Sequence, residues 1–147
     1  MKAFREMKMS FDSSSDNEAF ARAAVAAFIL PLDPTVAELG EIRTAVSEAV
    51  TNCVVHAYNG SRGIINMSVK IDADGTVCIK IRDSGCGIDD IDKAMEPLYT
   101  TSPDSERAGL GFAVMQSFSD SMKVRSAPGH GTTVTLVRRL SPRVSNV

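Results

Sequence analysis

Cysteine is scarce in this sequence, and its spacing fits no common framework. Three cysteines occur among 147 residues, and no two of them form a C-x-x-C pair. An odd number without that spacing argues against a disulfide scaffold and against a zinc site. Cys53 and Cys78 fall at apolar positions, so we expect both in the core. This usage is typical of a reduced, cytoplasmic protein.

Long apolar runs and an excess of one charge are also missing. No run approaches the length of a membrane span, and residues 1–5 lack the apolar segment of a signal peptide. The net charge is −2 and the pI is about 5.7, which gives no electrostatic footprint for nucleic acid. We therefore expect no membrane and no nucleic acid as a direct partner.

The remaining composition is that of an ordinary globular domain. Hydrophobic residues make up 44% and charged residues 23% of the chain. The length suffices for one domain with a substantial core. No internal repeat and no second domain is evident, so we predict a single domain over 1–147 with a frayed tail at 141–147.

The first helix is predicted at 16–29, opened by a capping box between Ser15 and Glu18. Its predicted inner face consists of four residues: Phe20, Ala24, Ala27 and Phe28. Arg22 lies away from that stripe. Solubility and partner binding explain Arg22 equally well.

A second helix follows, with Asp33 as N-cap and Pro34 at the first helical position. It runs to the C-terminal signal at 59–60. Alternating apolar residues predict strands, and a short helix is expected at 90–96. The predicted strands are 7–11, 65–71, 77–81, 122–126 and 132–140.

Three polar residues recur every fourth position in the second helix: Glu48, Asn52 and His56. At about 100° per residue, a step of four drifts by only about 40°, so all three project along one side. Taken alone, the pattern fits a solvated face beside an apolar stripe. The glycine segments downstream favour a site instead.

The first glycine segment is Asp83-x-Gly85-x-Gly87, directly after a predicted strand. Alternate glycines let the backbone pass close to a flat ligand or adopt a positive φ. A carboxylate at the strand end, Asp83, can accept a hydrogen bond from an exocyclic amine.

The second glycine segment, 109–111, opens a helix of about ten residues. Glycines there expose unpaired N–H groups to an anion, and Arg107 stands just before them. The polar stretch 97–108 has poor periodicity, so it is either a functional lid or a connector.

Together these motifs resemble the Bergerat-type ATP-binding fold shared by DNA gyrase, heat-shock chaperones, histidine kinases and mismatch-repair ATPases. Residues 48–56 resemble its N box, 83–87 and 109–111 its two glycine boxes, and 131–132 its final threonine-bearing box. The resemblance implies an α/β two-layer sandwich. Its sheet is mixed and mainly antiparallel, with helices on one face and ATP bound between helices and lid.

A closer resemblance is to the sporulation anti-sigma F factors of endospore-forming bacteria, and it covers about 7–138. The matching segments are 17–22, 32–35, 47–52, 98–101 and 106–112. It implies a homodimeric serine protein kinase. Such a kinase phosphorylates a small anti-anti-sigma partner and sequesters a sporulation sigma factor.

The resemblance also implies the residue roles at the base and the metal. Asp83 accepts from the adenine amino group, and Gly85 and Gly87 let the backbone pass the base. Thr132 bonds near the base. Asn52 holds Mg²⁺, because its amide oxygen suits a hard cation.

The remaining roles concern catalysis, phosphates and partners. Glu48 acts as the base for the serine hydroxyl, and His56 either tunes the site or takes part in catalysis. Arg22 binds protein partners. The terminal phosphates are expected to bind Arg107, Gly109 and Gly111. The further nucleotide contacts expected are Thr100, Thr101 and Leu110.

Other readings remain open. The chain can instead be a general-stress anti-sigma kinase or a nucleotide-gated regulator without transfer. A histidine kinase domain is disfavoured, because no acceptor hairpin precedes it, His130 lies in a turn and His56 in the N box. A gyrase-like ATPase requires further domains.

Overall fold

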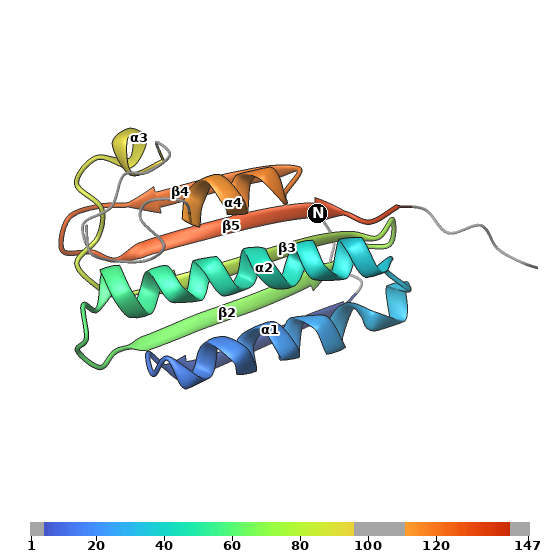
Figure 1. Ribbon diagram of the computed structural model, residues 1–147, viewed down its shortest axis with the longest axis horizontal. Coiled ribbons are helices and arrows are strands. Elements are labelled where there is room, and N and C mark those ends of the chain that lie inside the picture. The colour runs from blue at the N-terminus through green and yellow to red at the C-terminus, as the bar shows by residue number, and fades with distance from the viewer. Residues whose placement is uncertain (1–4, 96–110, 142–147) are drawn as a thin grey trace, which may run out of the picture.

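The computed structural model describes residues 5–95 and 111–141 (Figure 1). The strands are β1 (Arg5–Asp12), β2 (Ile64–Ile71), β3 (Thr76–Asp83), β4 (Ser121–Ser126) and β5 (Thr132–Arg139). The helices are α1 (Asp16–Ile29), α2 (Val36–Asn52), α3 (Ile91–Ala94) and α4 (Gly111–Ser117), with a 3₁₀ turn at Leu30–Leu32 and a π turn at Cys53–Ala57. Within the described ranges, none of the helices combines the length and apolar character that a membrane span requires.

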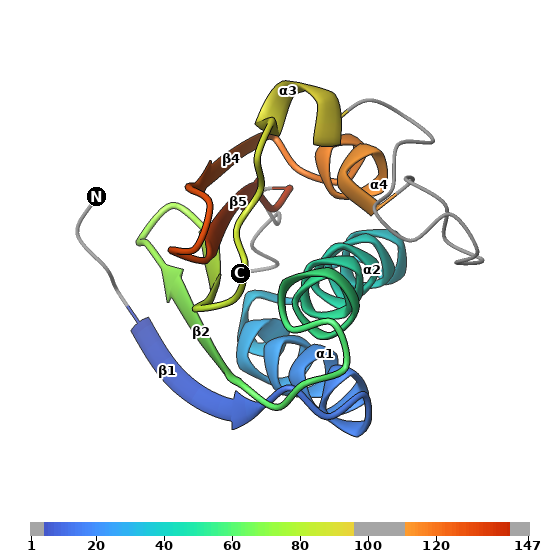
Figure 2. The same cartoon turned by 90° about the vertical axis from the view of Figure 1, so that its left-hand side faces the viewer.

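The strands form one sheet in the order β1-β2-β3-β5-β4, and all four pairings are antiparallel. Figure 2 shows α1, α2 and α4 gathered on one side of this sheet. The predicted sandwich with helices on one face is confirmed, and its sheet, predicted as mixed and mainly antiparallel, is antiparallel at every described pairing. The order places β3 and β5 side by side, which brings Asp83 opposite Thr132.

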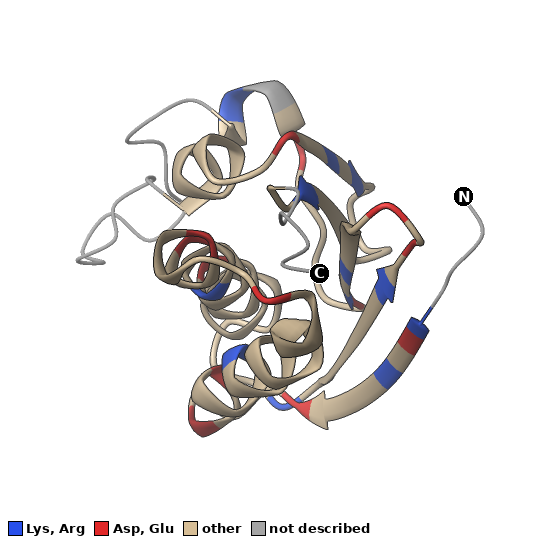
Figure 3. Cartoon of the chain, turned by 90° about the vertical axis from the view of Figure 1, so that its right-hand side faces the viewer, with Lys and Arg blue, Asp and Glu red and all other residues tan. Residues whose placement is uncertain are grey.

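Strict alternation along the strands separates a core face from an open face. Ile65, Met67, Val69 and Ile71 of β2 are at most 1% exposed. The residues between them face away from the helices. On the open face, six exposed cations stand on four strands: Lys8, Lys80, Arg82, Lys123, Arg125 and Arg139. Figure 3 shows Lys and Arg on these strands.

Helix α1 has its predicted bounds, but its predicted cap is wrong, and of the predicted inner phenylalanines only Phe28 packs against the core. Ala21, Val25 and Ile29 are fully buried, whereas Phe20 is 54% exposed. Small side chains let α1 pack closely, and the larger Phe20 is left at the edge. Ser15 has helical φ and ψ and makes no side-chain cap.

Helix α2 begins later than predicted. Asp33 takes a left-handed conformation that closes the 3₁₀ turn, and Thr35 is the N-cap. Thr35 and Glu38 form a reciprocal capping box, with the Glu38 N–H bonded to Thr35 Oγ1 at 3.0 Å and the Thr35 N–H to Glu38 Oε1 at 2.9 Å. The predicted end is confirmed, because Asn59 and Gly60 have positive φ after the π turn.

Candidate functional site

A cavity of about 600 Å³ opens between α2, the π turn, α4 and the ends of β3 and β5. Glu48, Asn52 and His56 all line it. The helical spacing therefore does place them along one side, even though His56 lies in the π turn. Burial lowers the pKa of His56, so its imidazole is neutral at pH 7.

Asp83 ends β3 and lies on the cavity wall, only 4% exposed. Its Oδ1 accepts two backbone hydrogen bonds, from Gly85 N–H at 3.0 Å and from Thr132 N–H at 3.1 Å. These bonds fix the carboxylate, whose oxygens are hydrogen-bond acceptors. The wall thus presents a fixed acceptor to whatever enters the cavity.

Cys53 is a neighbour of Asp83 that the sequence motifs did not single out for the site. Burial raises its thiol pKa well above the usual value, and the charge of Asp83 and a hydrogen bond with it raise the pKa further. Cys53 is therefore a neutral thiol that packs beside the carboxylate. The sequence indicated only its core position, which is confirmed.

Gly85 and Gly87 have no room for a side chain, because backbone from other segments lies against both of them. A Cβ on Gly85 would lie 2.3 Å from Ala57 O, and one on Gly87, which has φ of +77°, would lie 2.1 Å from Ala127 O. The positive φ expected for this motif is thus found at Gly87. The segments that approach these glycines closely are the π turn, at Gly85, and the β4–β5 turn, at Gly87.

The threonine-bearing motif is held by Ser126, another residue that the sequence gave no signal for. The Ser126 and Thr132 hydroxyls lie 2.8 Å apart. Ser126 Oγ also accepts from Ile88 N–H and donates to Gly131 O, each at 2.8 Å. Thr132 therefore lies on the cavity wall with its N–H bonded to Asp83 and its hydroxyl bonded to Ser126.

The start of α4 meets the polar face of α2. A Cβ on Gly111 would lie 3.2 Å from both Glu48 Oε2 and Asn52 Oδ1. The carboxylate and the amide oxygen therefore converge on one point of the cavity wall. The amide oxygen of Asn52 is a hard ligand of the kind that Mg²⁺ takes, and the Glu48 carboxylate stands beside it.

Several predicted residues lie elsewhere or outside the described residues. Arg22 stands on α1, partly exposed, and pairs with Glu18 at 3.3 Å; it is not part of the cavity lining. The predicted lid, 97–108, falls outside the described residues. So do five predicted nucleotide contacts: Thr100, Thr101, Arg107, Gly109 and Leu110.

Comparison with known proteins identifies the family. A model of the histidine kinase-like ATPase domain matches residues 11–138. The anti-sigma F factor of Caldanaerobacter subterraneus is 52% identical over 132 residues, 90% of this chain and 92% of that one. The anti-sigma F factor of Pasteuria penetrans is 53% identical over 136 residues, 91% of this chain and 90% of that one. The chain belongs to the anti-sigma F factor family.

A solved structure supports the fold of this family. The RsbU and RsbW domains of a Mycobacterium tuberculosis protein superpose with a TM-score of 0.69, at 22% identity, over 97% of this chain and 34% of that chain. At that identity the likeness concerns the fold alone. A histidine kinase-like ATPase domain implies ATP binding, and the cavity fits this. Its fixed acceptor at Asp83 suits a base amine, and the amide oxygen of Asn52 suits a phosphate-bound cation.

Proposed function

We propose that this chain is an ATP-dependent serine kinase that phosphorylates a small anti-anti-sigma protein and also binds and inhibits a sporulation sigma factor. One observation carries the proposal. In a chain of the anti-sigma F factor family, Glu48, Asn52 and Asp83 line a single cavity of about 600 Å³. Base recognition, metal binding and proton transfer thus have a residue each within one site.

Asp83 is proposed to select adenine. Its carboxylate is buried and held by two backbone N–H groups, so it accepts from an amino group without reorganising. Guanine carries a carbonyl where adenine carries its amine, and a carboxylate cannot donate to it. Gly85, Gly87 and Thr132 shape the wall around this acceptor.

Asn52 is proposed as the protein ligand of Mg²⁺, through its amide oxygen. Within residues 5–95 and 111–141, no three His, Cys, Asp or Glu side chains gather as a metal cluster. Mg²⁺ requires none when phosphates and water complete its coordination. When bound, it neutralises charge on the phosphates. The family resemblance assigns the phosphates further to Arg107 and 109–111.

Glu48 is proposed as the general base. It stands one helical turn from Asn52, half-buried at the cavity wall, and its carboxylate can accept the proton of an incoming serine hydroxyl. The serine oxygen then bonds to phosphorus as the bond to ADP breaks. His56, neutral and one turn further, is left to buttress the site.

The proposed partner surface extends beyond this cavity, although the serine to be phosphorylated has to enter it. Arg22 on α1 is the proposed contact for the sigma factor and the anti-anti-sigma protein, and the active form is proposed to be a cytoplasmic homodimer. Family membership and the partial exposure of Arg22 support this assignment.

A labelling experiment tests the proposal. The purified chain is incubated with γ-labelled ATP, Mg²⁺ and the anti-anti-sigma protein, and sigma binding is titrated in parallel. We expect acid-stable phosphoserine on the partner and its loss on chelation of Mg²⁺. Acid-labile label would indicate histidine transfer. ATP-dependent sigma binding without label would make the chain a nucleotide-gated regulator.

A further inference from the structure

A tyrosine outside the recognised motifs connects the π turn to the glycine loop. Tyr58 directly follows the π turn, and its N–H bonds to Cys53 O at 3.1 Å. Its side chain lines the cavity beside His56. No role in the proposed function uses it so far.

The Tyr58 hydroxyl bridges two backbone groups, one at the start of β2 and one directly after β3. It donates to Ile64 O, at the start of β2, at 2.6 Å and accepts from Ser84 N–H at 2.7 Å. Ser84 is the residue immediately after Asp83. The phenol therefore ties the peptide that carries the base acceptor to the first residue of β2.

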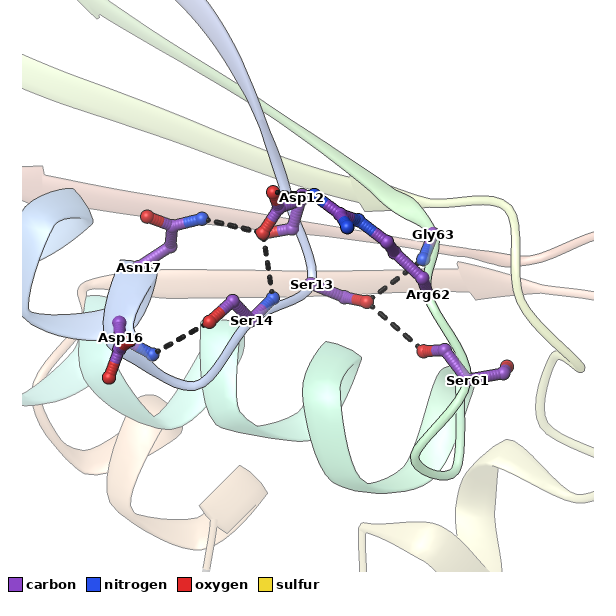
Figure 4. Close-up of polar contacts among 8 residues, drawn as sticks. All are labelled: Asp12, Ser13, Ser14, Asp16, Asn17, Ser61, Arg62 and Gly63. Carbon is purple, nitrogen blue, oxygen red and sulfur yellow. Dashed lines mark hydrogen bonds and ion pairs between the residues drawn. The ribbon is translucent and has the colours of Figure 1, made fainter.

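The ring cannot easily move from this position. A Cβ on Gly63 would lie 2.2 Å from Tyr58 Cε1, so the ring lies directly against the glycine backbone. Gly63 also donates its N–H to Ser13 Oγ in the β1–α1 turn at 2.9 Å, a bond that does not involve the Tyr58 ring (Figure 4). Ser13 Oγ also donates to Ser61 O at 3.2 Å.

Three consecutive N–H groups of the glycine loop have fixed acceptors. Ser84 N–H bonds to the Tyr58 hydroxyl at 2.7 Å, Gly85 N–H to Asp83 Oδ1 at 3.0 Å and Cys86 N–H to Ala57 O at 3.0 Å. Two of these acceptors, Ala57 and Tyr58, are adjacent residues. Two of the three N–H groups of the glycine loop are thus held by one short segment after α2.

We propose that Tyr58 is a positioning residue for base recognition: its hydroxyl fixes the Asp83–Ser84 peptide and so aims the Asp83 carboxylate into the cavity. The inference rests on the proposed ATP site. Its physical basis is preorganisation, since a loop already held in its binding geometry loses less conformational freedom when ligand enters.

Two variants and a matched control test it. Tyr58→Phe removes the hydroxyl alone, and Gly63→Ala displaces the ring while keeping the hydroxyl. Ser13→Ala is the control, because Ser13 Oγ also accepts one backbone N–H and donates to one carbonyl in the same segment, but it does not reach the glycine loop. We expect both test variants to bind ATP about three- to tenfold more weakly. The control should bind within about twofold of the parental protein.

Three further readouts separate positioning from general loosening. The preference for ATP over GTP should fall in Tyr58→Phe by a similar factor. In phosphorylation, KM for ATP should rise while kcat holds. Amide exchange at 84–86 in the nucleotide-free protein should speed up in Tyr58→Phe and stay parental in Ser13→Ala.

Each contrary result is decisive. Parental ATP affinity, ATP/GTP preference or amide exchange in Tyr58→Phe overturns the inference, and so does an equal loss of affinity in Ser13→Ala. Absence of ATP binding by the parental protein overturns the proposed function and this inference together. Normal parental binding with an unaffected Tyr58→Phe overturns the inference alone.

Discussion

At the scale of single residues, Asp83 combines a structural and a recognition task. Its Oδ1 holds Gly85 and Thr132 through their N–H groups, and an asparagine can keep both bonds with its own oxygen. What asparagine cannot keep is the second acceptor oxygen. Substitution to asparagine therefore separates recognition from folding.

We expect Asp83→Asn to fold normally and to bind ATP about ten- to a hundredfold more weakly. A hydrogen bond to a charged group contributes about 1.5–3 kcal/mol, which corresponds to that range. Titration calorimetry measures the affinity. Asp74→Asn is the matched control, since Asp74 also accepts a backbone N–H, at 3.1 Å, but in the β2–β3 turn. Unchanged affinity in folded Asp83→Asn would remove Asp83 from the site.

The residues that sequence could and could not predict at this scale differ in kind. Glu48, Asn52 and Asp83 stand out because helical spacing and a strand end expose polar groups in a pattern. Cys53 and Ser126 act through contacts between segments distant in the chain, which no local pattern records. The sequence indicated that the glycines of the first box allow a close approach or a positive φ. It could not show that the backbone of Ala57 and Ala127 approaches them, because those segments are distant in the chain.

At the scale of elements, the start of α2 is tied to the end of the sheet through Glu38. Burial raises the pKa of Glu38, but hydrogen bonds from the Thr35 and Ser141 N–H groups outweigh burial and lower the pKa to about 2. Glu38 Oε2 accepts from Ser141 N–H at 2.7 Å. One carboxylate thus caps a helix and holds the residue after β5.

Since folding lowers this pKa, the stability that Glu38 contributes is present above its ordinary pKa of 4.5 and is lost as pH falls towards about 2. We expect Glu38→Gln to be less stable than the parental protein at pH 7. The difference should shrink between pH 4.5 and 2. Urea unfolding across this range measures it.

Thr35→Ala is the control for this prediction, because it removes the neutral half of the same cap. It should cost about 0.5–2 kcal/mol in the free energy of unfolding, with a weaker pH dependence than Glu38→Gln in this window, because the Thr35 side chain is the smallest of the contributions that lower the Glu38 pKa. A pH-independent difference for Glu38→Gln would show that the charge of Glu38 contributes nothing.

The elements themselves were largely predictable, and the errors have physical causes. Strands β2 and β3 alternate strictly, and that period fixes which face is buried. The many alanines of α1 give little contrast in hydrophobicity between its faces. The prediction therefore placed Phe20 on the inner face, where the structure has Ala21, Val25 and Ile29. At α2, Asp33-Pro34 resembled a start, whereas the reciprocal box of Thr35 and Glu38 determines it.

At the scale of the whole molecule, the partner contact proposed on α1 lies apart from the cavity lining. Arg22 pairs with Glu18 at 3.3 Å, and an exposed pair of this kind contributes little to stability. Arg22→Glu should therefore fold normally. We expect it to bind the sigma factor or the anti-anti-sigma protein at least about tenfold more weakly, with ATP affinity unchanged.

Pull-down and titration with both partners check this prediction. Arg125→Glu is the control, an equal charge reversal on an exposed residue of β4. Arg125 alternates with Val124, which packs against the core, so it lies on the open face of the sheet. Normal binding of both partners by Arg22→Glu would leave Arg22 with a role in solubility only.

The two proposed activities can be separated within α2. In the proposed mechanism, Glu48 is needed only when a serine hydroxyl loses its proton, whereas Asn52 would support nucleotide binding itself through the metal. Glu48→Gln should bind Mg-ATP and sigma factor nearly normally but transfer phosphate about a hundred- to ten-thousandfold more slowly. Asn52→Ala should impair transfer and any ATP-dependent partner binding together.

A phosphorylation time course beside a sigma titration compares the two variants. The comparison is sharp because both side chains converge on Gly111, so a general disturbance of that contact would affect both variants alike. Transfer at the parental rate by Glu48→Gln would refute the assignment of the base. Equal loss of sigma binding in both variants would mean that Glu48 supports nucleotide binding. Phosphate transfer and sigma binding would then both depend on the nucleotide held by Glu48 and Asn52.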